Sequence, residues 1–180
     1  MKIVLSPSKT KTITTVDNDG AAHTAVQDGQ FQPHITQDLV KHVQSLDVAA
    51  LGKALKLKDN KAQALFDFYQ DFESHPVGLA CESYDGIAFK YLDWQNLSEE
   101  AKAFGESHLV VMSALYGVVE PMMGVRDYRL DMVDKVGINL YDTWRETVDA
   151  YFHKEDWILN LASKEYAKMV NHPKVVTVEF

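Results

Sequence analysis

The chain has 180 residues, of which 46% are hydrophobic and 24% are charged, a composition typical of one globular domain. Its formal net charge of −8 argues against broad binding to nucleic acid but leaves room for a local basic patch. The single cysteine excludes an intrachain disulfide, and no apolar run reaches the roughly 20 residues that a membrane-spanning helix needs.

The first predicted element is a buried strand at the N-terminus. The β-branched run Lys2-Ile-Val-Leu-Ser6 ends at Pro7, a pattern typical of such a strand. No signal-peptide pattern precedes it, so we expect a cytoplasmic protein. Residues 11–35 then lack a sustained hydrophobic period and contain Asp17-Asn-Asp-Gly20, a turn signal. We interpret this stretch as a surface loop.

Three amphipathic helices are predicted next. The first begins with Thr36 as its N-cap, because a threonine hydroxyl can accept a hydrogen bond from an amide of the first turn. The second begins near Asp47. The third has an apolar face at helical spacing, formed by Ala62, Leu65, Phe66, Tyr69 and Phe72. We expect these helices to serve as a scaffold.

The pattern changes after Pro76. The segment Tyr84-Asp-Gly-Ile-Ala-Phe-Lys90 predicts a turn that leads into a short strand. A helix is predicted to begin at Ser98, whose hydroxyl can cap it, and to end at Gly105. The apolar run from His108 to Leu115 fits a buried strand or a buried helix, and we favour the strand.

The last quarter of the chain predicts a helix, a strand, a second helix and a final strand. The first helix is marked by apolar residues at helical spacing: Tyr141, Trp144, Val148 and Tyr151. A strand over 158–161 precedes a helix capped by Ser163, and the last strand runs from Val175 to Phe180. Because the chain stops inside that strand, it is either an edge strand or part of a truncated chain. The uneven order of elements predicts a single α+β or α/β domain over residues 1–180, with an irregular mixed sheet surrounded by helices.

Polar motifs follow the predicted strands. In Ser6-Pro-Ser-Lys-Thr10, the hydroxyls of Ser6, Ser8 and Thr10 and the ammonium of Lys9 lie just past a strand, where backbone amides are free. This combination suits a phosphate or a carboxylate. The motif lacks the glycines of a P-loop, so an anion site and an ordinary turn remain equally good interpretations.

A second candidate for anion binding is the segment that contains Arg126, Tyr128 and Arg129. Guanidinium groups bind phosphate oxygens in bidentate fashion, and an aromatic ring can stack on a base. The alternative is that the arginines pair with the nearby acidic residues Asp127, Asp131 and Asp134.

Further polar residues are candidates for the lining of a pocket at the strand ends: Asp85, Ser113, Tyr116, Gly117, Asn160 and Ser163. Ser113 would need a nearby base to act as a nucleophile, and a hydroxyl that satisfies the backbone is the more usual explanation. An Asp-Gly pair is first a turn signal, although a catalytic carboxylate is conceivable. The seven histidines show no metal-ligand spacing. We therefore assign no catalytic residue, metal or cofactor.

Taken together, five ordered motifs resemble the YaaA family, the bacterial peroxide stress protein family. They are Ser6-Pro-Ser-Lys-Thr10, Tyr84-Asp-Gly86, Ser113-Ala-Leu-Tyr-Gly117, Tyr128-Arg-Leu-Asp-Met132 and Asn160-Leu-Ala-Ser-x-Glu-Tyr166. The resemblance implies a cytoplasmic protein that limits peroxide damage by lowering unincorporated iron. It also implies a mixed α/β fold, a helix-hairpin-helix element, and binding to duplex or branched DNA.

The resemblance also indicates where the helix-hairpin-helix element would lie, and it shows how this chain differs from the family at its C-terminal end. Ser98 to Gly105 would be its first helix, Gly105-Glu-Ser-His108 the hairpin, and 109–115 the second helix, in conflict with the strand that we favour there. Family members usually continue past the end of this chain with a basic segment, so we expect a C-terminally truncated member.

Three functions compete at this point. The first is a DNA-binding stress protein that uses Lys9, Arg126 and Arg129 for phosphate and Tyr116 or Tyr128 for a base or sugar. The second is an enzyme acting on a nucleotide or nucleobase in a pocket formed by the strand-end motifs, with Asp85 as the candidate acid or base. The third, direct iron coordination, has the least support, because the sequence has no cluster of cysteines or histidines.

Overall fold

A mixed five-stranded sheet forms the centre of the protein. The computed structural model describes residues 1–13 and 31–178. The sheet has the order β4-β3-β1-β6-β7, with bounds β1 Lys2–Leu5, β3 Leu109–Ser113, β4 Gly117–Val119, β6 Ile158–Asn160 and β7 Val175–Thr177. Strand β1 pairs in parallel with both β3 and β6, β7 is parallel to β6, and β4 is antiparallel to β3. The predicted mixed α/β fold is confirmed.

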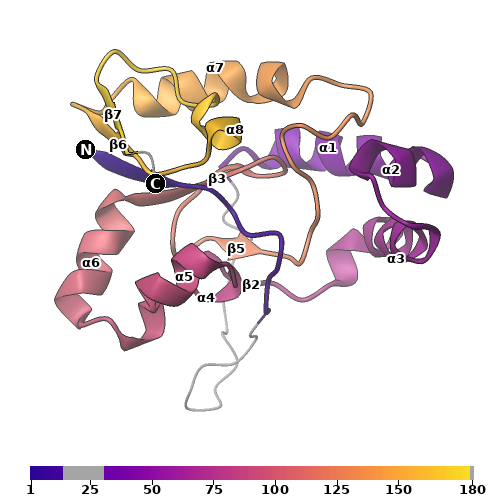
Figure 1. Ribbon diagram of the computed structural model, residues 1–180, viewed down its shortest axis with the longest axis horizontal. Helices are drawn as coiled ribbons and strands as arrows, with labels where there is room; N and C mark the ends of the chain where they lie inside the picture. The colour runs from indigo at the N-terminus through magenta and orange to yellow at the C-terminus, as the bar shows by residue number, and fades with distance from the viewer. Residues whose placement is uncertain (14–30, 179–180) are drawn as a thin grey trace.

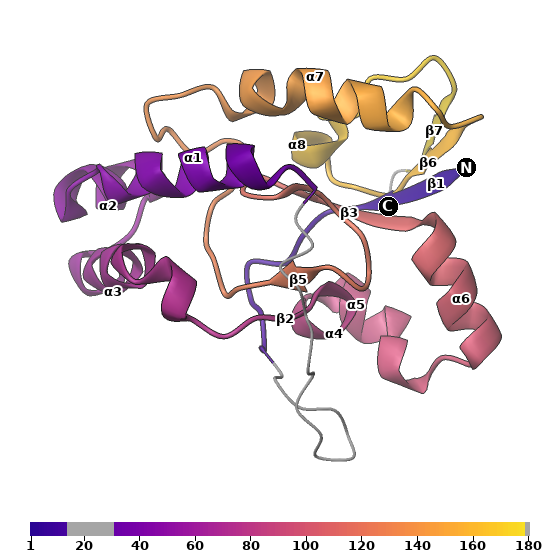
Figure 2. The same ribbon diagram turned by 180° about the vertical axis from the view of Figure 1, so that it is seen from behind.

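Helices cover both faces of this sheet. In Figures 1 and 2, α7 and α8 lie on one side, α4 to α6 lie on the other, and α1 to α3 stand together at one end. Their bounds are α1 Pro33–Gln44, α2 Val48–Leu55, α3 Asp59–Gln70, α4 Ala80–Ser83, α5 Ile87–Leu92, α6 Glu99–His108, α7 Leu140–Phe152 and α8 Lys164–Ala167. Short 3₁₀ helices at Phe72–Ser74 and Trp94–Asn96 and a separate antiparallel pair, β2 Gly78–Leu79 with β5 Gly124–Val125, complete the described chain.

The position of β3 in the core explains why its sequence is a continuous apolar run. All five residues of β3 are buried, as expected for a strand that is covered on both faces. On the side of α6, Leu109 packs with Trp94 and Cys81 and with the partly buried Ile3 and Leu5. Val4 belongs to the larger cluster of the core. No helix in the described part of the chain is long and apolar enough to cross a membrane.

Several predicted elements are confirmed. Asp47 caps α2 by accepting a hydrogen bond from the Ala50 amide at 2.7 Å, and Ser98 caps α6 in the same way. Helices α3 and α7 and strand β6 lie where the hydrophobic spacing places them. Strand β7 occupies an edge of the sheet. The predicted turn at 17–20 falls outside the described residues.

The prediction that Thr36 begins a helix is wrong. Helix α1 begins at Pro33, three residues earlier, and a proline fits the first turn because its missing N–H would have no helical partner there. Thr36 lies within the helix and is buried. Its hydroxyl donates a hydrogen bond to the carbonyl of Leu115 at 3.2 Å, which ties α1 to the end of β3.

Two further predictions are wrong, one about the type of an element and one about the end of a helix. Residues 87–92 form helix α5 rather than a strand, with Ile87 exposed and Phe89 buried. Gly105 does not end α6, which continues to His108. A Cβ on Gly105 would lie 2.6 Å from the Trp94 ring, so this glycine permits close packing rather than a stop.

The helix-hairpin-helix element is not present at 98–115. Helix α6 runs directly into β3, and residues 109–113 are extended and paired with β1. The strand that the apolar run favours is therefore confirmed, and the mapping of a second helix onto 109–115 is wrong. Parallel pairing with β1 determines the conformation of a run whose sequence alone fits either structure.

The corner between β3 and β4 depends on Gly117. Its φ is +74°, and a Cβ there would lie 2.6 Å from the Trp144 ring. Trp144 is buried and donates a hydrogen bond to the carbonyl of Ala114 at 2.9 Å. The indole of α7 thus packs directly on the turn that follows Ser113.

We expect Gly117→Ala to destabilise the protein by about 2–5 kcal/mol, because backbone strain and overpacking add. Urea unfolding measures this difference in the free energy of unfolding. Gly137→Ala is the matched control: its φ is +90°, but its Cβ would meet only His42 Nε2 at 3.8 Å. The control should lose only about 1–2 kcal/mol from strain. Equal losses for the two variants would contradict the packing argument.

Candidate functional site

The ends of the parallel strands bring two of the predicted polar motifs together. Ser6 follows β1 and Asn160 ends β6, and the two strands are neighbours in the sheet. The amide of Ser163 donates to Ser6 Oγ at 2.9 Å, and Ser6 Oγ donates to Ser163 Oγ at 3.1 Å. The buried Asn160 side chain accepts a hydrogen bond from the amide of Ala162 at 3.1 Å. These side chains therefore fix the turn after β6.

The motif at 84–86 packs against the same N-terminal segment. The amide of Asp85 donates to the carbonyl of Thr10 at 3.0 Å, and Lys11 forms a β-bridge with Tyr84. A Cβ on Gly86 would lie 2.9 Å from Ser8 Oγ, so the close approach requires glycine. The Asp85 carboxylate itself pairs with Lys90 at 3.2 Å.

A chain of buried hydroxyls connects the motifs at 84, 113 and 128. Ser113 Oγ lies 2.7 Å from the Tyr128 hydroxyl, which lies 3.2 Å from the Tyr84 hydroxyl. Ser113 Oγ also accepts hydrogen bonds from the amides of Leu115 and Tyr116. Burial raises the pKa of Tyr128 to about 12, so its phenol stays protonated near neutral pH. Ser113 therefore contacts no base among the described residues and satisfies the backbone.

Three cations meet at a small cavity: one from each of two motifs, and a third that directly follows the first motif. Lys9, Lys11 and Arg129 line a space of about 10 Å³, which is room for roughly one water molecule. We call these three residues the cation cluster. Lys9 Nζ pairs with Asp131 at 2.9 Å, and Tyr166 donates to the same carboxylate at 3.0 Å.

The other two members of the cation cluster form no ion pair with the described residues. Lys11 is 9% exposed, and its ammonium donates to the carbonyl of Tyr128 at 2.7 Å and lies 4.1 Å from the centre of the Tyr128 ring. Arg129 forms no hydrogen bond or ion pair through its side chain with any residue in the ranges 1–13 and 31–178, and its Nε is buried without a partner. A buried donor without an acceptor is unfavourable, so a ligand oxygen at this point would be stabilising.

Burial lowers the pKa of Lys11, whereas a neighbouring carboxylate raises the pKa of Lys9. Burial lowers the pKa of Lys11 to about 8, with a contribution from Arg129, while Asp127 and Asp131 oppose the shift. The hydrogen bond to Asp131 raises the pKa of Lys9. The cluster therefore combines a fully charged lysine on the surface with a buried amine that gives up its proton more easily.

Arg126 and Tyr116 have other roles. Arg126 is buried, pairs with Glu73 at 3.1 Å, donates to the carbonyl of His75 at 3.2 Å and lies over the Phe72 ring. The Tyr116 hydroxyl accepts a hydrogen bond from the Arg126 amide at 3.2 Å. The predicted clamp of two arginines is therefore not formed, because Arg126 contacts the 72–75 segment while Arg129 faces Lys9 and Lys11.

Neither Asp131 nor Asp134 is the arginine partner that the alternative interpretation expects. Asp131 pairs with Lys9, and Asp134 accepts a hydrogen bond from the Asp131 amide at 2.8 Å. Lys11 is the residue of this site that the sequence did not single out. It lies one position past the end of the first motif, and its signal in the sequence is only a second lysine two residues after Lys9.

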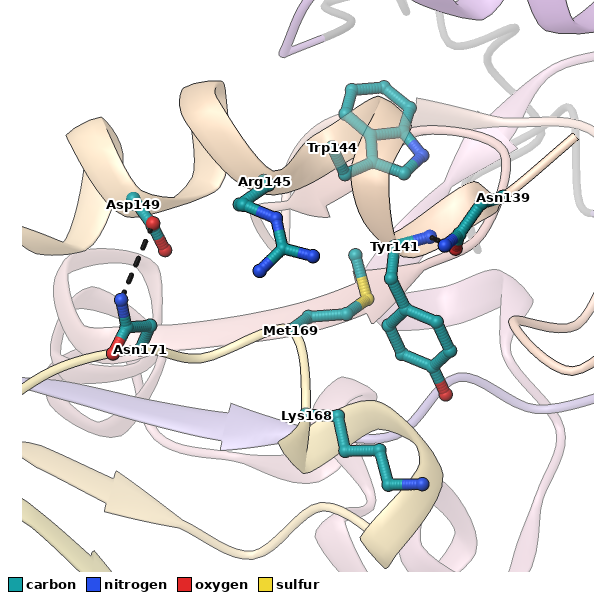
Figure 3. Close-up of a pocket in the computed structure, with 8 residues that line it drawn as sticks. All are labelled: Asn139, Tyr141, Trp144, Arg145, Asp149, Lys168, Met169 and Asn171. Atoms are coloured by element: carbon teal, nitrogen blue, oxygen red, sulfur yellow. Dashed lines mark hydrogen bonds between the residues drawn. The ribbon is translucent and has the colours of Figure 1, made fainter.

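Other cavities lie away from the cation cluster. Figure 3 shows one of about 390 Å³ between α7 and the chain after α8. Its lining residues are Asn139, Tyr141, Trp144, Arg145, Asp149, Lys168, Met169 and Asn171. Arg145 pairs with Asp142, and Asn171 donates to Asp149, so positive charge is balanced there. Another cavity, of about 410 Å³, is lined in part by Ser163, Lys164 and Thr177.

Neither a reactive thiol nor a cluster of metal ligands is part of the described chain. Cys81 is buried, and burial raises the pKa of its thiol to about 12. Within residues 1–13 and 31–178, no group of three or more His, Cys, Asp or Glu side chains is arranged to hold a metal ion.

Comparisons with known proteins agree with the motifs. The family model described as peroxide stress protein YaaA matches residues 1–180. A UPF0246 protein of Finegoldia magna is 34% identical over 170 residues, which cover 94% of this chain and 66% of that protein. UPF0246 proteins of Rickettsia bellii and Rickettsia felis are 33% and 29% identical, and each match covers 79% of this chain and about 60% of the relative. The chain thus spans less than two thirds of the length of these relatives.

We expect Lys11→Met to stabilise the protein most at low pH. The folded-state pKa of Lys11 is about 8, below its ordinary value of 10.5, so the unfolded chain binds more protons between these values. Burying the charged amine therefore destabilises the native state below about pH 8, and this effect disappears as the pH rises.

The gain in the free energy of unfolding from Lys11→Met should fall by roughly 2 kcal/mol between pH 7 and pH 9.5. Chemical denaturation at both pH values measures it. Lys9→Met is the matched control, because the pKa of Lys9 is raised and its effect should stay constant over this range. A gain from Lys11→Met that does not depend on pH would contradict the argument.

The thiol of Cys81 should be inert in the folded protein. With its pKa near 12, the thiolate fraction at pH 8 is about a hundred-fold or more below that of an exposed cysteine. Absorbance with a disulfide reagent should show labelling that is slower by at least that factor without urea than with it. Rapid labelling of the native protein, or its oxidation by dilute hydrogen peroxide, would show that the thiol is accessible.

Proposed function

This chain belongs to the YaaA peroxide stress protein family, and we propose that it limits peroxide damage by binding the phosphate backbone of DNA through the cation cluster. The proposal rests on one observation: Arg129 lies beside Lys9 and Lys11, and its buried Nε has no hydrogen-bond partner among the described residues. A phosphate oxygen would supply the acceptor that Arg129 Nε lacks. Guanidinium groups bind phosphate in bidentate fashion, which favours this ligand over a neutral one.

The arrangement suits contact with a backbone rather than with bases. Lys9 is 68% exposed along its side chain, so it can reach an external phosphate, while the Tyr128 ring is buried and cannot stack on a base. The formal net charge of −8 opposes long-range attraction to DNA. We therefore propose binding that is local to the cluster and weakened steeply by salt.

A second cationic surface supports the same proposal. Helices α2 and α3 are joined by a short turn, and four lysines lie on or beside it: Lys53, Lys56, Lys58 and Lys61. The N-cap residue Lys58 makes no side-chain hydrogen bond to the first turn of α3, although Asp59 places a carboxylate in that turn and Asn60 accepts a hydrogen bond from the Lys61 amide. This helix pair is our candidate for the hairpin element that the resemblance implies.

The proposed protection acts on DNA and not through bound iron. Lysine and arginine side chains bind phosphate but do not coordinate iron at neutral pH. We propose that the effect of the family on unincorporated iron is indirect. We also propose that the protein acts in the cytoplasm, where DNA is accessible to it.

A second candidate function is action on a nucleotide or nucleobase in the cavity that Ser163 lines. The observation that favours it is the polar network beside this cavity, in which Asn160 contacts Thr177 at 3.3 Å and Ser163 contacts Ser6. Asp85 pairs with Lys90 and does not line this cavity. Competition by mononucleotides, but not by DNA, would favour this candidate over the first.

We expect Arg129→Ala to weaken DNA binding about three- to thirty-fold and to reduce the dependence of log K on log salt by about one unit, because one phosphate contact is lost. Fluorescence anisotropy with duplex and branched DNA, at about 50 and 200 mM salt, measures both quantities.

Arg145→Ala is the matched control for this experiment. It also removes an arginine, but Arg145 is exposed, pairs with Asp142 and lies on α7 away from the cation cluster. The control should bind like the unchanged protein. Equal losses for the two variants would assign the effect to net charge alone, and no binding by any variant would contradict the proposal.

A further inference from the structure

Lys11 is a buried lysine that forms no ion pair with a carboxylate among the described residues. Its Nζ lies 4.1 Å from the centre of the Tyr128 ring and 5.7 Å from that of Tyr84. Within residues 1–13 and 31–178, its ammonium donates one hydrogen bond, to the Tyr128 carbonyl, although an ammonium has three hydrogens to donate. A buried lysine is ordinarily paired, so this environment favours the neutral amine.

The surroundings of Lys11 suit a ligand with two chemical features. Lys9 and Arg129 line the same cavity and carry the positive charge that a phosphate needs. The Lys11 amine, 9% exposed, lies behind them. A ligand whose phosphate contacts Lys9 and Arg129 would therefore present an adjoining group to Lys11 Nζ.

We propose that Lys11 is a nucleophilic amine that forms an imine with an aldehyde bearing a phosphate, which Lys9 and Arg129 hold beside it. The inference rests on the proposed function, because the opened sugar of an abasic site in DNA is an aldehyde flanked by phosphates. Small phosphorylated aldehydes share this chemistry and are the other source of such a ligand.

The reaction balances without an oxidant or a reductant. The lone pair of Lys11 Nζ forms a bond to the aldehyde carbon, and the carbonyl oxygen leaves as water with the two hydrogens of the neutral amine. Burial lowers the pKa of Lys11 to about 8 against the opposing charges of Asp127 and Asp131, and Arg129 adds to the lowering. At pH 7 the neutral share is then roughly 300-fold larger than for an ordinary lysine.

Access to Lys11 depends on Lys9. The cavity of about 10 Å³ holds a water molecule and not an aldehyde. Lys9 forms one wall of it through its ion pair with Asp131, and its side chain is 68% exposed. When Lys9 exchanges Asp131 for the ligand phosphate, this wall opens, so the phosphate is part of the mechanism of entry.

Reductive trapping tests this proposal on the full chain. The protein is incubated at pH 7 with pyridoxal 5′-phosphate, or with a duplex that contains one abasic site, and is reduced with sodium borohydride. Mass spectrometry then locates the adduct. We expect the adduct at Lys11 to exceed that at the exposed Lys168 by about tenfold or more, since the neutral fraction of its amine is larger.

Two variants and one control separate the role of the nucleophile from that of the phosphate-binding residue. Lys11→Arg keeps the charge and removes the nucleophile, so trapping should be lost, while Lys168→Arg should trap normally. Arg129→Gln leaves Lys11 in place but removes a charge that helps to lower its pKa. It should therefore lower the yield with pyridoxal 5′-phosphate by a larger factor than the yield with pyridoxal, which has no phosphate. Circular dichroism checks that each variant is folded. Fluorescence anisotropy on the same samples measures the fraction of DNA bound, so that trapping yields are compared at equal occupancy.

The outcomes distinguish this inference from the proposed function. Trapping of both ligands at Lys11 supports both, and trapping of pyridoxal 5′-phosphate without any binding of DNA supports the inference with a small-molecule source. Binding of DNA without an adduct at Lys11 overturns the inference alone. Adducts spread over the exposed lysines, or unchanged in Lys11→Arg, also overturn it.

Discussion

The parallel pairing of β1 with both β3 and β6 is the constraint on which the rest of the structure depends. Because β1 lies between them, the segments that follow all three strands leave the sheet at the same edge. Ser6, Ser113 and Asn160 are far apart in the sequence but all lie there. The side chain of each accepts a hydrogen bond from a backbone amide and so stabilises a turn. The polar motifs therefore have a structural role first, and they position the segments that carry the cations.

The electrostatics of the site follow from that geometry. The end of β1 continues into Lys9 and Lys11, and the segment around Tyr128 packs against it through a carbonyl, an aromatic ring and one ion pair. Burial of Lys11 opposes folding at neutral pH, while the neighbouring acids reduce this effect. In an acidic protein, a fold that holds three cations together in this way concentrates positive charge where the overall composition would not place it.

Helix positions could be predicted where an apolar face or a cap determines them, as for the Asp47 cap and the Trp144 face. Local sequence patterns gave a wrong or undecided prediction where tertiary contacts determine the structure. Gly105 allows the approach of the Trp94 ring, Thr36 bonds to the end of β3, and pairing with β1 fixes 109–113 as a strand. At the site, Lys9 could be predicted as a polar residue just past a strand, and Arg129 as part of an arginine-containing segment suited to an anion. Lys11 could not, since its role depends on burial between two tyrosine rings from other segments.

The edge strand β7 has a consequence for how the protein behaves in solution. Val176 and Val178 remain 54% and 40% exposed, and in the described chain β7 pairs only with β6. Among the described residues, the outer side of β7 has no strand partner and lies next to apolar side chains, the combination that promotes strand addition. A segment of this protein or of another molecule that added a strand here would cover both the free backbone groups and the two valines.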